Sequence, residues 1–298
     1  MRALLPSTVR PFHRAVLQWY RAEGRPLPWR RTRNPYRILV SEVMLQQTQV
    51  SRVIPKYREF LNTFPTLSSL AHSTPGQVLS VWQGLGYNRR ALWLRQAARR
   101  IKSEYSGRFP RHLQDLTTLP GIGLYTARAI MTFAFDRQEP VIDTNISRVL
   151  SRLFQPPPGG ATFVEFARSV LPNRNAYDWN QALMDLGALH CTARRPSCSV
   201  CPLTRLCPSS GRVRAITVKN SPPEPSRYGI PRRIYRGRVV KALSERSPIG
   251  PAQLASLVGL RTSASDIRWL ERVLMKLVDE GLLRIQRRGG AWKAARVS

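Results

Sequence analysis

Acidic residues are scarce in this chain of 298 residues, in which 17 Asp and Glu stand against 48 Lys and Arg. The formal net charge of +31 favours a polyanionic partner, because it steers such a partner and releases counterions on binding. Ribosome association, attraction to membrane surfaces and an arginine-rich proteome are the alternatives. We favour nucleic acid, since the basic residues run along the whole chain instead of forming one tail.

Two kinds of segment are also absent from the sequence. No apolar stretch approaches the length needed to span a bilayer, so a membrane-spanning protein is excluded. Nothing at the N-terminus resembles a secretion signal, which argues against a disulfide-stapled secreted protein. We therefore expect a cytoplasmic protein, in the simplest case bacterial.

Cysteine is almost absent, and its four copies gather in one stretch as Cys191, Cys198, Cys201 and Cys207. A chain that places every thiol in one cluster is expected to build a metal centre. Four thiolates can hold a tetrahedral zinc or a [4Fe–4S] cluster. Zinc ribbons normally pair two CxxC knuckles, and here only Cys198 and Cys201 form one. We therefore favour iron–sulfur over zinc.

The hydrophobic pattern predicts a mainly helical protein. Helical periodicity covers residues 8–24, much of 35–135, and then about 143–154, 161–171 and 178–189, with little alternating strand pattern. Residues 208–233 are rich in Ser, Pro and Arg and are predicted to form a linker. Behind it, two short helices (234–244 and 251–258) and a longer one are expected, the last N-capped by Ser265 and stopped by Gly281. A hairpin of 282–285 and 291–297 around Gly289 and Gly290 completes a winged-helix-like pattern.

Three short segments carry residues of chemical interest. In Leu119-Pro-Gly-Ile-Gly, Gly121 and Gly123 allow a tight turn whose free N–H groups can bind a phosphate at a helix N-terminus. A purely structural helix hairpin is the alternative. Asp143 precedes a helical run and is, on its own, best interpreted as an N-cap. Glu42 lies among apolar residues, where a carboxylate gains proton affinity, although a surface or ion-paired glutamate is the alternative.

Together these segments resemble a known family. The motifs LPWR (27–30), SEVMLQQTQV (41–50), GLGY (84–87), LPGIGLYTA (119–127), VIDTN (141–145) and the cysteine stretch occur in the order found in MutY-type adenine DNA glycosylases. These enzymes belong to the helix-hairpin-helix superfamily that includes endonuclease III. The resemblance covers roughly residues 8–208 and implies a two-lobed helical glycosylase with a [4Fe–4S] loop. We expect residues 28–136 to form a six-helix barrel and residues 137–208 to form the iron–sulfur lobe, which the N-terminal helix at 1–27 joins. A linker at 209–233 and a winged-helix-like domain at 234–298 follow.

The resemblance also implies a mechanism. The enzyme flips an adenine from the duplex and hydrolyses its N-glycosidic bond. Glu42 matches the general acid and Asp143 the carboxylate that stabilises the sugar cation, with Asn145 and Tyr125 positioning it. Related strand-cutting enzymes have a lysine where this chain has Tyr125, so we expect a monofunctional glycosylase.

Further residues match DNA-binding positions of the family. Gln47 and Tyr87 match groups that wedge into the duplex, Arg30 matches a basic residue near the pocket, and Gly121 and Gly123 match the hairpin. The expected partner is double-stranded DNA with an adenine opposite guanine or 8-oxoguanine, bound by a monomer on the bacterial nucleoid.

Two other functions remain open at this point. One is removal of thymine or uracil opposite guanine on the same scaffold, and the other is a non-catalytic iron–sulfur DNA-binding regulator. The 65 or so residues after the linker are too few for the Nudix-like domain with which full-length family members recognise 8-oxoguanine. The winged-helix-like segment could instead add DNA affinity through Arg268 and Arg272, bind a protein, or stabilise the catalytic lobes.

Overall fold

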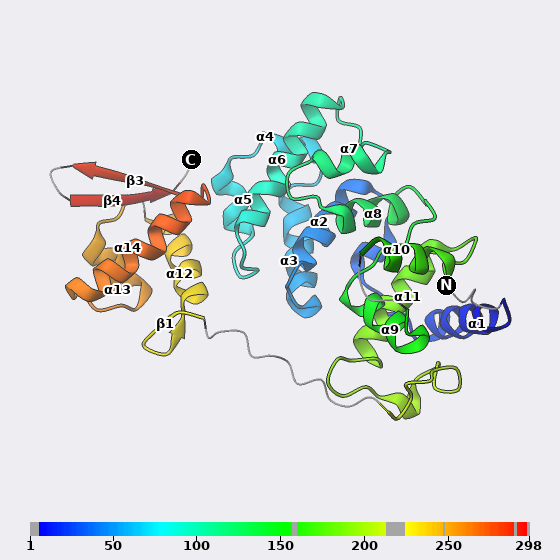
Figure 1. The fold of residues 1–298 in the computed structure, drawn as a ribbon. Helices are drawn as coiled ribbons and strands as arrows, with labels where there is room; N and C mark the ends of the chain where they lie inside the picture. Colours follow the sequence, from blue (N-terminus) through cyan, green and yellow to red (C-terminus); the bar gives the residue numbers. More distant parts are fainter. Residues whose placement is uncertain (1–5, 157–159, 213–223, 247, 289–290, 297–298) are drawn as a thin grey trace. The chain divides into compact units, whose positions relative to one another are not determined.

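The computed structural model of the chain describes residues 6–156, 160–212, 224–246, 248–288 and 291–296. It confirms the predicted mainly helical architecture, with small sheets only near the C-terminus of the described chain (Figure 1). The helices are α1 (Pro6–Glu23), η1 (Pro28–Arg31), α2 (Pro35–Leu45), α3 (Val50–Thr63), α4 (Leu67–His72), α5 (Pro75–Val81), α6 (Arg89–Glu104), α7 (Leu113–Thr118), α8 (Leu124–Phe133), α9 (Thr144–Phe154), α10 (Gly160–Ser169), α11 (Ala176–Leu189), η2 (Cys198–Val200), α12 (Arg232–Glu245), α13 (Pro251–Val258) and α14 (Ala264–Asp279). The strands are β1 (Ser226–Arg227), β2 (Ile230–Pro231), β3 (Leu283–Arg288) and β4 (Ala291–Arg296).

The chain forms two compact units. Unit 1 contains Met1–Leu39, Pro110–Thr118 and Ile122–Lys219, and unit 2 contains Val40–Phe109, Leu119–Gly121 and Asn220–Ser298. Each unit is therefore assembled from segments distant in sequence. Within the described residues, none of the helices combines the length and the apolar character needed to cross a bilayer.

The core of unit 1 joins α1 to α9, α10, α11 and the cysteine loop. Phe12 and Val16 of α1 are buried, and the Phe12 ring meets Trp179 of α11 edge-on, with 4.8 Å between ring centroids. Leu203, within the cysteine loop, is 3% exposed in the same core. Burial of apolar surface therefore fixes both the first helix and the thiol-bearing loop against α11.

Helix α9 forms because its local signals agree. Its apolar residues Ile146, Val149, Leu150 and Leu153 recur at helical spacing and are all buried. Asp143 caps the N-terminus, and Gln155 ends the helix in the left-handed conformation. The predicted helix at about 143–154 is confirmed.

In unit 2, α3, α4, α5 and α6 surround buried aromatic side chains. Trp82, just after α5, is fully buried and packs edge-on against Phe60 of α3. Thr66 and Thr74 begin α4 and α5 with complete capping boxes, each offering its hydroxyl oxygen to a backbone N–H three residues later.

The segment after residue 223 has the predicted order of three helices followed by an antiparallel hairpin. Two details differ from prediction. Ser263, and not Ser265, is the N-cap of α14, because the Ser263 side chain accepts the Asp266 N–H and the helix begins one residue later, at Ala264. The short β1–β2 pair also lies in the stretch predicted as linker, where Arg227 pairs with the buried Asp266. The predicted Gly289-Gly290 turn lies outside the described residues.

We expect Phe12→Ala to destabilise unit 1 by about 3–5 kcal/mol, because it opens a cavity between α1 and α11. Urea unfolding followed by circular dichroism measures this loss. The matched control is Gln18→Ala, an exposed position on the same helix, which should change stability by less than about 0.5 kcal/mol. Equal effects of the two substitutions would show that α1 does not anchor this core.

Candidate active site and thiol cluster

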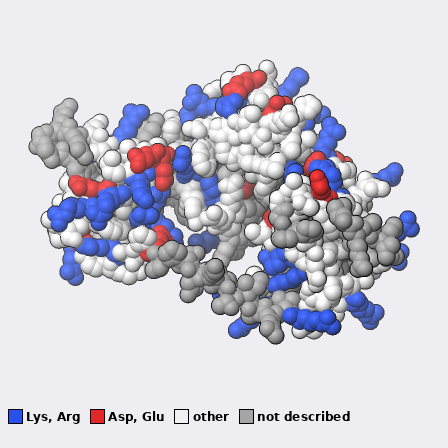
Figure 2. All heavy atoms as spheres, in the orientation of Figure 1, with Lys and Arg blue, Asp and Glu red and all other residues white. Residues whose placement is uncertain are grey.

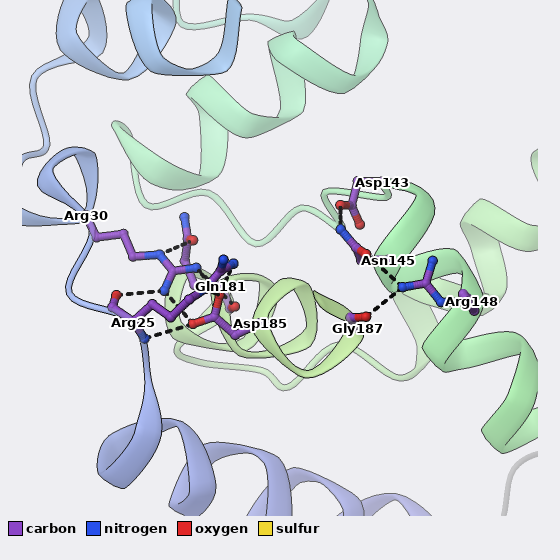
Figure 3. Close-up of polar contacts among 8 residues, drawn as sticks. All are labelled: Arg25, Arg30, Asp143, Asn145, Arg148, Gln181, Asp185 and Gly187. Atoms are coloured by element: carbon purple, nitrogen blue, oxygen red, sulfur yellow. Dashed lines mark hydrogen bonds and ion pairs between the residues drawn. The ribbon is translucent and has the colours of Figure 1, made fainter. Parts of the chain in front are cut away.

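Asp143 is a partly buried carboxylate at the start of α9. Its Oδ1 accepts the Ile146 backbone N–H at 2.7 Å, and its Oδ2 accepts the Asn145 side-chain amide at 2.7 Å (Figure 3). Burial raises the pKa of Asp143 above the ordinary 3.8, while these donors and Arg148 act to lower it. The structure thus confirms the N-cap and brings Asp143 and Asn145 together, leaving a carboxylate with one fixed orientation.

Arg148 supports this pair from one helical turn further along α9. It donates to Asn145 Oδ1 at 2.8 Å, to the Gly187 carbonyl at 2.7 Å and to the Cys191 carbonyl at 2.6 Å. Figure 3 shows its guanidinium between Asn145 and Gly187. The start of α9 is therefore bonded to the end of α11 and to the first cysteine of the loop.

Gly187 lets α11 approach α9 closely. A Cβ at this position would lie 2.6 Å from the Asn145 Cβ and 3.0 Å from its Cα, closer than atoms can pack. The absence of a side chain at position 187 therefore determines how near α11 comes to the Asp143–Asn145 pair.

The four cysteines line one cavity, together with residues of α9 and α11. Cys191, Cys201 and Cys207 also pack against the unit 1 core. Arg152 places Nη1 3.3 Å from the Cys191 sulfur and donates to the Thr192 carbonyl at 2.7 Å. Four thiols around one cavity, beside a guanidinium that compensates thiolate charge, fit the donor set of an iron–sulfur cluster.

Arg30 lies in a buried ion-pair network that the sequence did not predict. Its guanidinium donates twice to Asp185 and once to Gln181 Oε1, each at 2.7 Å. Arg25 binds the same carboxylate through its side chain and its backbone N–H. Burial acts to raise the Asp185 pKa, but the Arg30 and Arg25 donors outweigh it and the pKa is lowered. Figure 3 shows this network on α11, the helix that also carries Gly187.

Asp185, Gln181, Arg148 and Arg152 are the functional-site residues that sequence reasoning missed. One feature of the sequence could have pointed to Asp185. It is an acidic residue on an apolar helix, in a chain where only 17 of 298 residues are acidic. Its partner Arg30 lies 155 positions away in sequence, so no local pattern could reveal the pair.

The other predicted residues are placed as follows. Glu42 is 5% exposed on α2, so its alternative as a surface glutamate is wrong. It belongs to unit 2, whereas Asp143, Asn145 and Tyr125 belong to unit 1. Tyr125 is half-buried in the first turn of α8.

The turn between α7 and α8 contains both predicted hairpin glycines. Gly121 has φ +74°, and a Cβ there would lie 2.8 Å from the Trp93 Cβ. Gly123 is the N-cap of α8. A left-handed backbone and close packing thus require glycine at position 121, while Gly123 leaves the N-terminus of α8 uncovered by a side chain.

Comparison with known proteins agrees with this geometry. The family described as "HhH-GPD superfamily base excision DNA repair protein" matches residues 40–169, and "Iron-sulfur binding domain of endonuclease III" matches residues 191–207. The chain is 39% identical to an adenine DNA glycosylase of Mycolicibacterium smegmatis over 280 residues, which cover 90% of this chain and 91% of that protein. It is 40% identical to the human adenine DNA glycosylase over 222 residues, 70% of this chain and 41% of the human protein.

A solved structure of a thermostable thymine-DNA glycosylase has a TM-score of 0.66 and 29% identity, covering 70% of this chain and 98% of that one. The Mycolicibacterium smegmatis alignment leaves only a tenth of this chain uncovered, so it must include part of the segment after residue 208. The short C-terminal segment is therefore not peculiar to this chain. The chain belongs to the adenine DNA glycosylases of the helix-hairpin-helix superfamily, and Cys191, Cys198, Cys201 and Cys207 form its iron–sulfur site.

Proposed function

We propose that this chain removes adenine mispaired with guanine or 8-oxoguanine in double-stranded DNA, with Asp143 as the carboxylate that stabilises the sugar. The observation that carries the proposal is the partly buried Asp143, oriented by the Ile146 N–H and the Asn145 amide. Breaking the N-glycosidic bond leaves positive charge on the sugar, and a preorganised carboxylate lowers the energy of that state.

Glu42 is the proposed general acid. Adenine leaves readily only when a ring nitrogen is protonated, so Glu42 gives its proton to the base as the C1′–N9 bond breaks and the bonding electrons leave with adenine. A water molecule then adds to C1′ and gives up a proton, leaving an abasic site. The burial of Glu42 on α2 supports this role, because a general acid must be held in a fixed position to reach the base.

Tyr125 supports a monofunctional reaction. A phenol cannot form the imine through which related lysine-bearing enzymes cut the strand. We propose that Tyr125 and Asn145 instead position Asp143 and that the chain releases the base without cutting the backbone.

DNA binding is proposed to rest on the net charge of +31, on the Gly121–Gly123 turn, and on Gln47 and Tyr87. Figure 2 shows Lys and Arg outnumbering Asp and Glu over the drawn face. Arg30 is proposed to contribute differently from the sequence-based expectation. Because Asp185 and Gln181 already bind its guanidinium, we propose that Arg30 stabilises the wall of the adenine pocket and does not contact a phosphate.

The cluster's proposed contribution is structural. When bound by the four thiolates, it fixes the loop at 191–207, where Arg194, Arg195 and Arg205 are available for phosphates. We also propose, from sequence, the domain boundaries at residues 27, 136, 208 and 233, a monomeric state and residence on the bacterial nucleoid.

Removal of thymine or uracil opposite guanine is the second candidate, favoured by the likeness to a thymine-DNA glycosylase. Duplexes carrying A, T, U or C opposite guanine or 8-oxoguanine, treated with alkali after reaction, separate the two. We expect strand breaks only with adenine and only after alkali, because Tyr125 does not cut the strand. Release from T or U duplexes alone, or efficient borohydride trapping on DNA, would overturn the assignment.

Asp143→Asn should slow single-turnover adenine release by ~10³-fold and leave duplex binding intact, since it removes the negative charge that faces the sugar. The matched control is Asp178→Asn, an exposed acid on α11, which should retain the wild-type rate. Unchanged release by Asp143→Asn would show that Asp143 is not the catalytic carboxylate. A wild-type chain that bound the duplex and released no adenine would instead favour the DNA-binding regulator.

The pH dependence follows from the raised pKa of Asp143. An acid with a raised pKa gains its proton, and so loses its charge, at a higher pH than an ordinary aspartate when the solution is acidified. Because the reaction needs the charged form, kcat/KM should fall on the acid side at a pH above 3.8. A rate constant that stays flat down to about pH 4, with folding verified by circular dichroism, would contradict this role.

A further inference from the structure

Arg90 is a buried arginine whose guanidinium binds backbone carbonyls instead of a carboxylate. It lies in the first turn of α6 and is 5% exposed. Its Nη1 donates to the carbonyls of Val43 at 2.9 Å and Met44 at 3.1 Å, and also to that of Gln46. These three acceptors form the end of α2 and the turn that follows it.

The second arm of the same guanidinium reaches another turn. Nη2 donates to the carbonyls of Leu85 at 3.3 Å and Gly86 at 3.1 Å, and to Thr48 Oγ1 at 3.1 Å. Thr48 in turn donates to the Leu85 carbonyl at 3.4 Å. One side chain therefore joins the turn at 46–48 to the turn at 84–87.

Each of these turns carries one residue with a strained backbone. Gln47 has φ +54° and Tyr87 has φ +48°, in the left-handed region that residues other than glycine seldom adopt. Arg90 binds the carbonyl immediately before each of them, namely those of Gln46 and Gly86. Both residues are exposed, Tyr87 to 58%.

Burial of a charge without an acidic partner is unfavourable and calls for compensation. Burial lowers the pKa of Arg90 to about 10, and only Tyr87 acts against this. The five carbonyls and the Thr48 hydroxyl, with the Trp82 and Tyr87 rings 5.6 and 5.3 Å from the guanidinium carbon, provide that compensation. Lysine could not replace these bonds, because its single ammonium group cannot reach both turns at once.

We propose that Arg90 is a positioning residue that sets the spacing and backbone conformation of the two turns, so that Gln47 and Tyr87 enter the duplex as one rigid pair when adenine is flipped out. The inference rests on the proposed DNA-binding roles of Gln47 and Tyr87. Arg90 itself does not touch DNA in this account, since it is 5% exposed and both of its Nη atoms already bind groups within the protein.

The test measures base extrusion apart from hydrolysis. The fluorescent adenine analogue 2-aminopurine is placed at the target position opposite guanine, and the full chain carries Asp143→Asn. In that background Arg90→Met should reduce the fluorescence rise on binding, and in the wild-type background it should slow adenine release by ~10²-fold, the usual effect of a small misplacement. Arg89→Met, which removes an exposed charge from the same helical turn, should change neither quantity.

A duplex with an abasic site separates positioning from general damage, because no base has to be extruded from it. Arg90→Met should bind it as tightly as the wild type. If Arg90→Met does not fold, Thr48→Val replaces it in the test. This variant removes one hydroxyl from the network and should give an intermediate loss of extrusion. Arg90→Lys should resemble Arg90→Met and not the wild type.

Wild-type extrusion by Arg90→Met, or by Thr48→Val where Arg90→Met does not fold, would overturn the inference. Equal losses of extrusion and abasic-site binding would also overturn it, by showing a merely structural role. If the wild-type chain released no adenine, the proposed function would fail instead, while the fluorescence comparison would still report on Arg90.

Discussion

The fixed orientation of the partly buried Asp143 carboxylate at the N-terminus of α9 is the constraint on which the rest of unit 1 depends. A charge that has lost part of its hydration needs fixed donors, and the Ile146 N–H and the Asn145 amide supply them. Asn145 is held in turn by Arg148, which also bonds α11 and the cysteine loop. The hydrophobic core of α1, α9 and α11 then keeps these elements at the distance that such bonds require.

The need of buried polar groups for fixed partners also explains why several arginines of this basic chain bind groups inside the protein. Arg30 and Arg25 share the buried Asp185, Arg148 and Arg152 bind carbonyls of the cysteine loop, and Arg90 joins two turns. A planar guanidinium with five donors can bridge several carbonyls at once, which neither lysine nor an apolar residue can do. Some of the arginines thus stabilise the fold, and the exposed basic residues are available to bind DNA.

Local patterns in the sequence predicted much of the fold and the chemical residues. The helix at 143–154 has apolar residues at helical spacing and an aspartate cap, so local physics was sufficient for both its limits and the N-cap role of Asp143. The four cysteines were identified by their isolation, and the fourteen-residue α11 by its continuous pattern. The cap of α14 was misplaced by two positions because Ser263 and Ser265 offer the same hydroxyl, and only the backbone geometry distinguishes them.

What the sequence did not predict depends on contacts between distant segments. Asp185 with Arg30, and Arg90 with the turn after α2, are charged residues that local patterns assign to the surface. Even Arg30, singled out by its motif, was expected to face DNA because nothing near it in sequence indicates a buried carboxylate partner. Buried charges satisfied by remote carbonyls or carboxylates become apparent only once the helices are packed.

The most direct test of this account is the titration of the Asp143 carboxyl group, followed by ¹³C NMR of the full chain with labelled aspartate and assigned by its absence from the Asp143→Asn spectrum. The account predicts a midpoint above the ordinary 3.8 but below neutral pH, so that a partly buried yet charged carboxylate is present when the enzyme works. A midpoint at or below 3.8, or a carboxyl group still protonated at neutral pH, would contradict it.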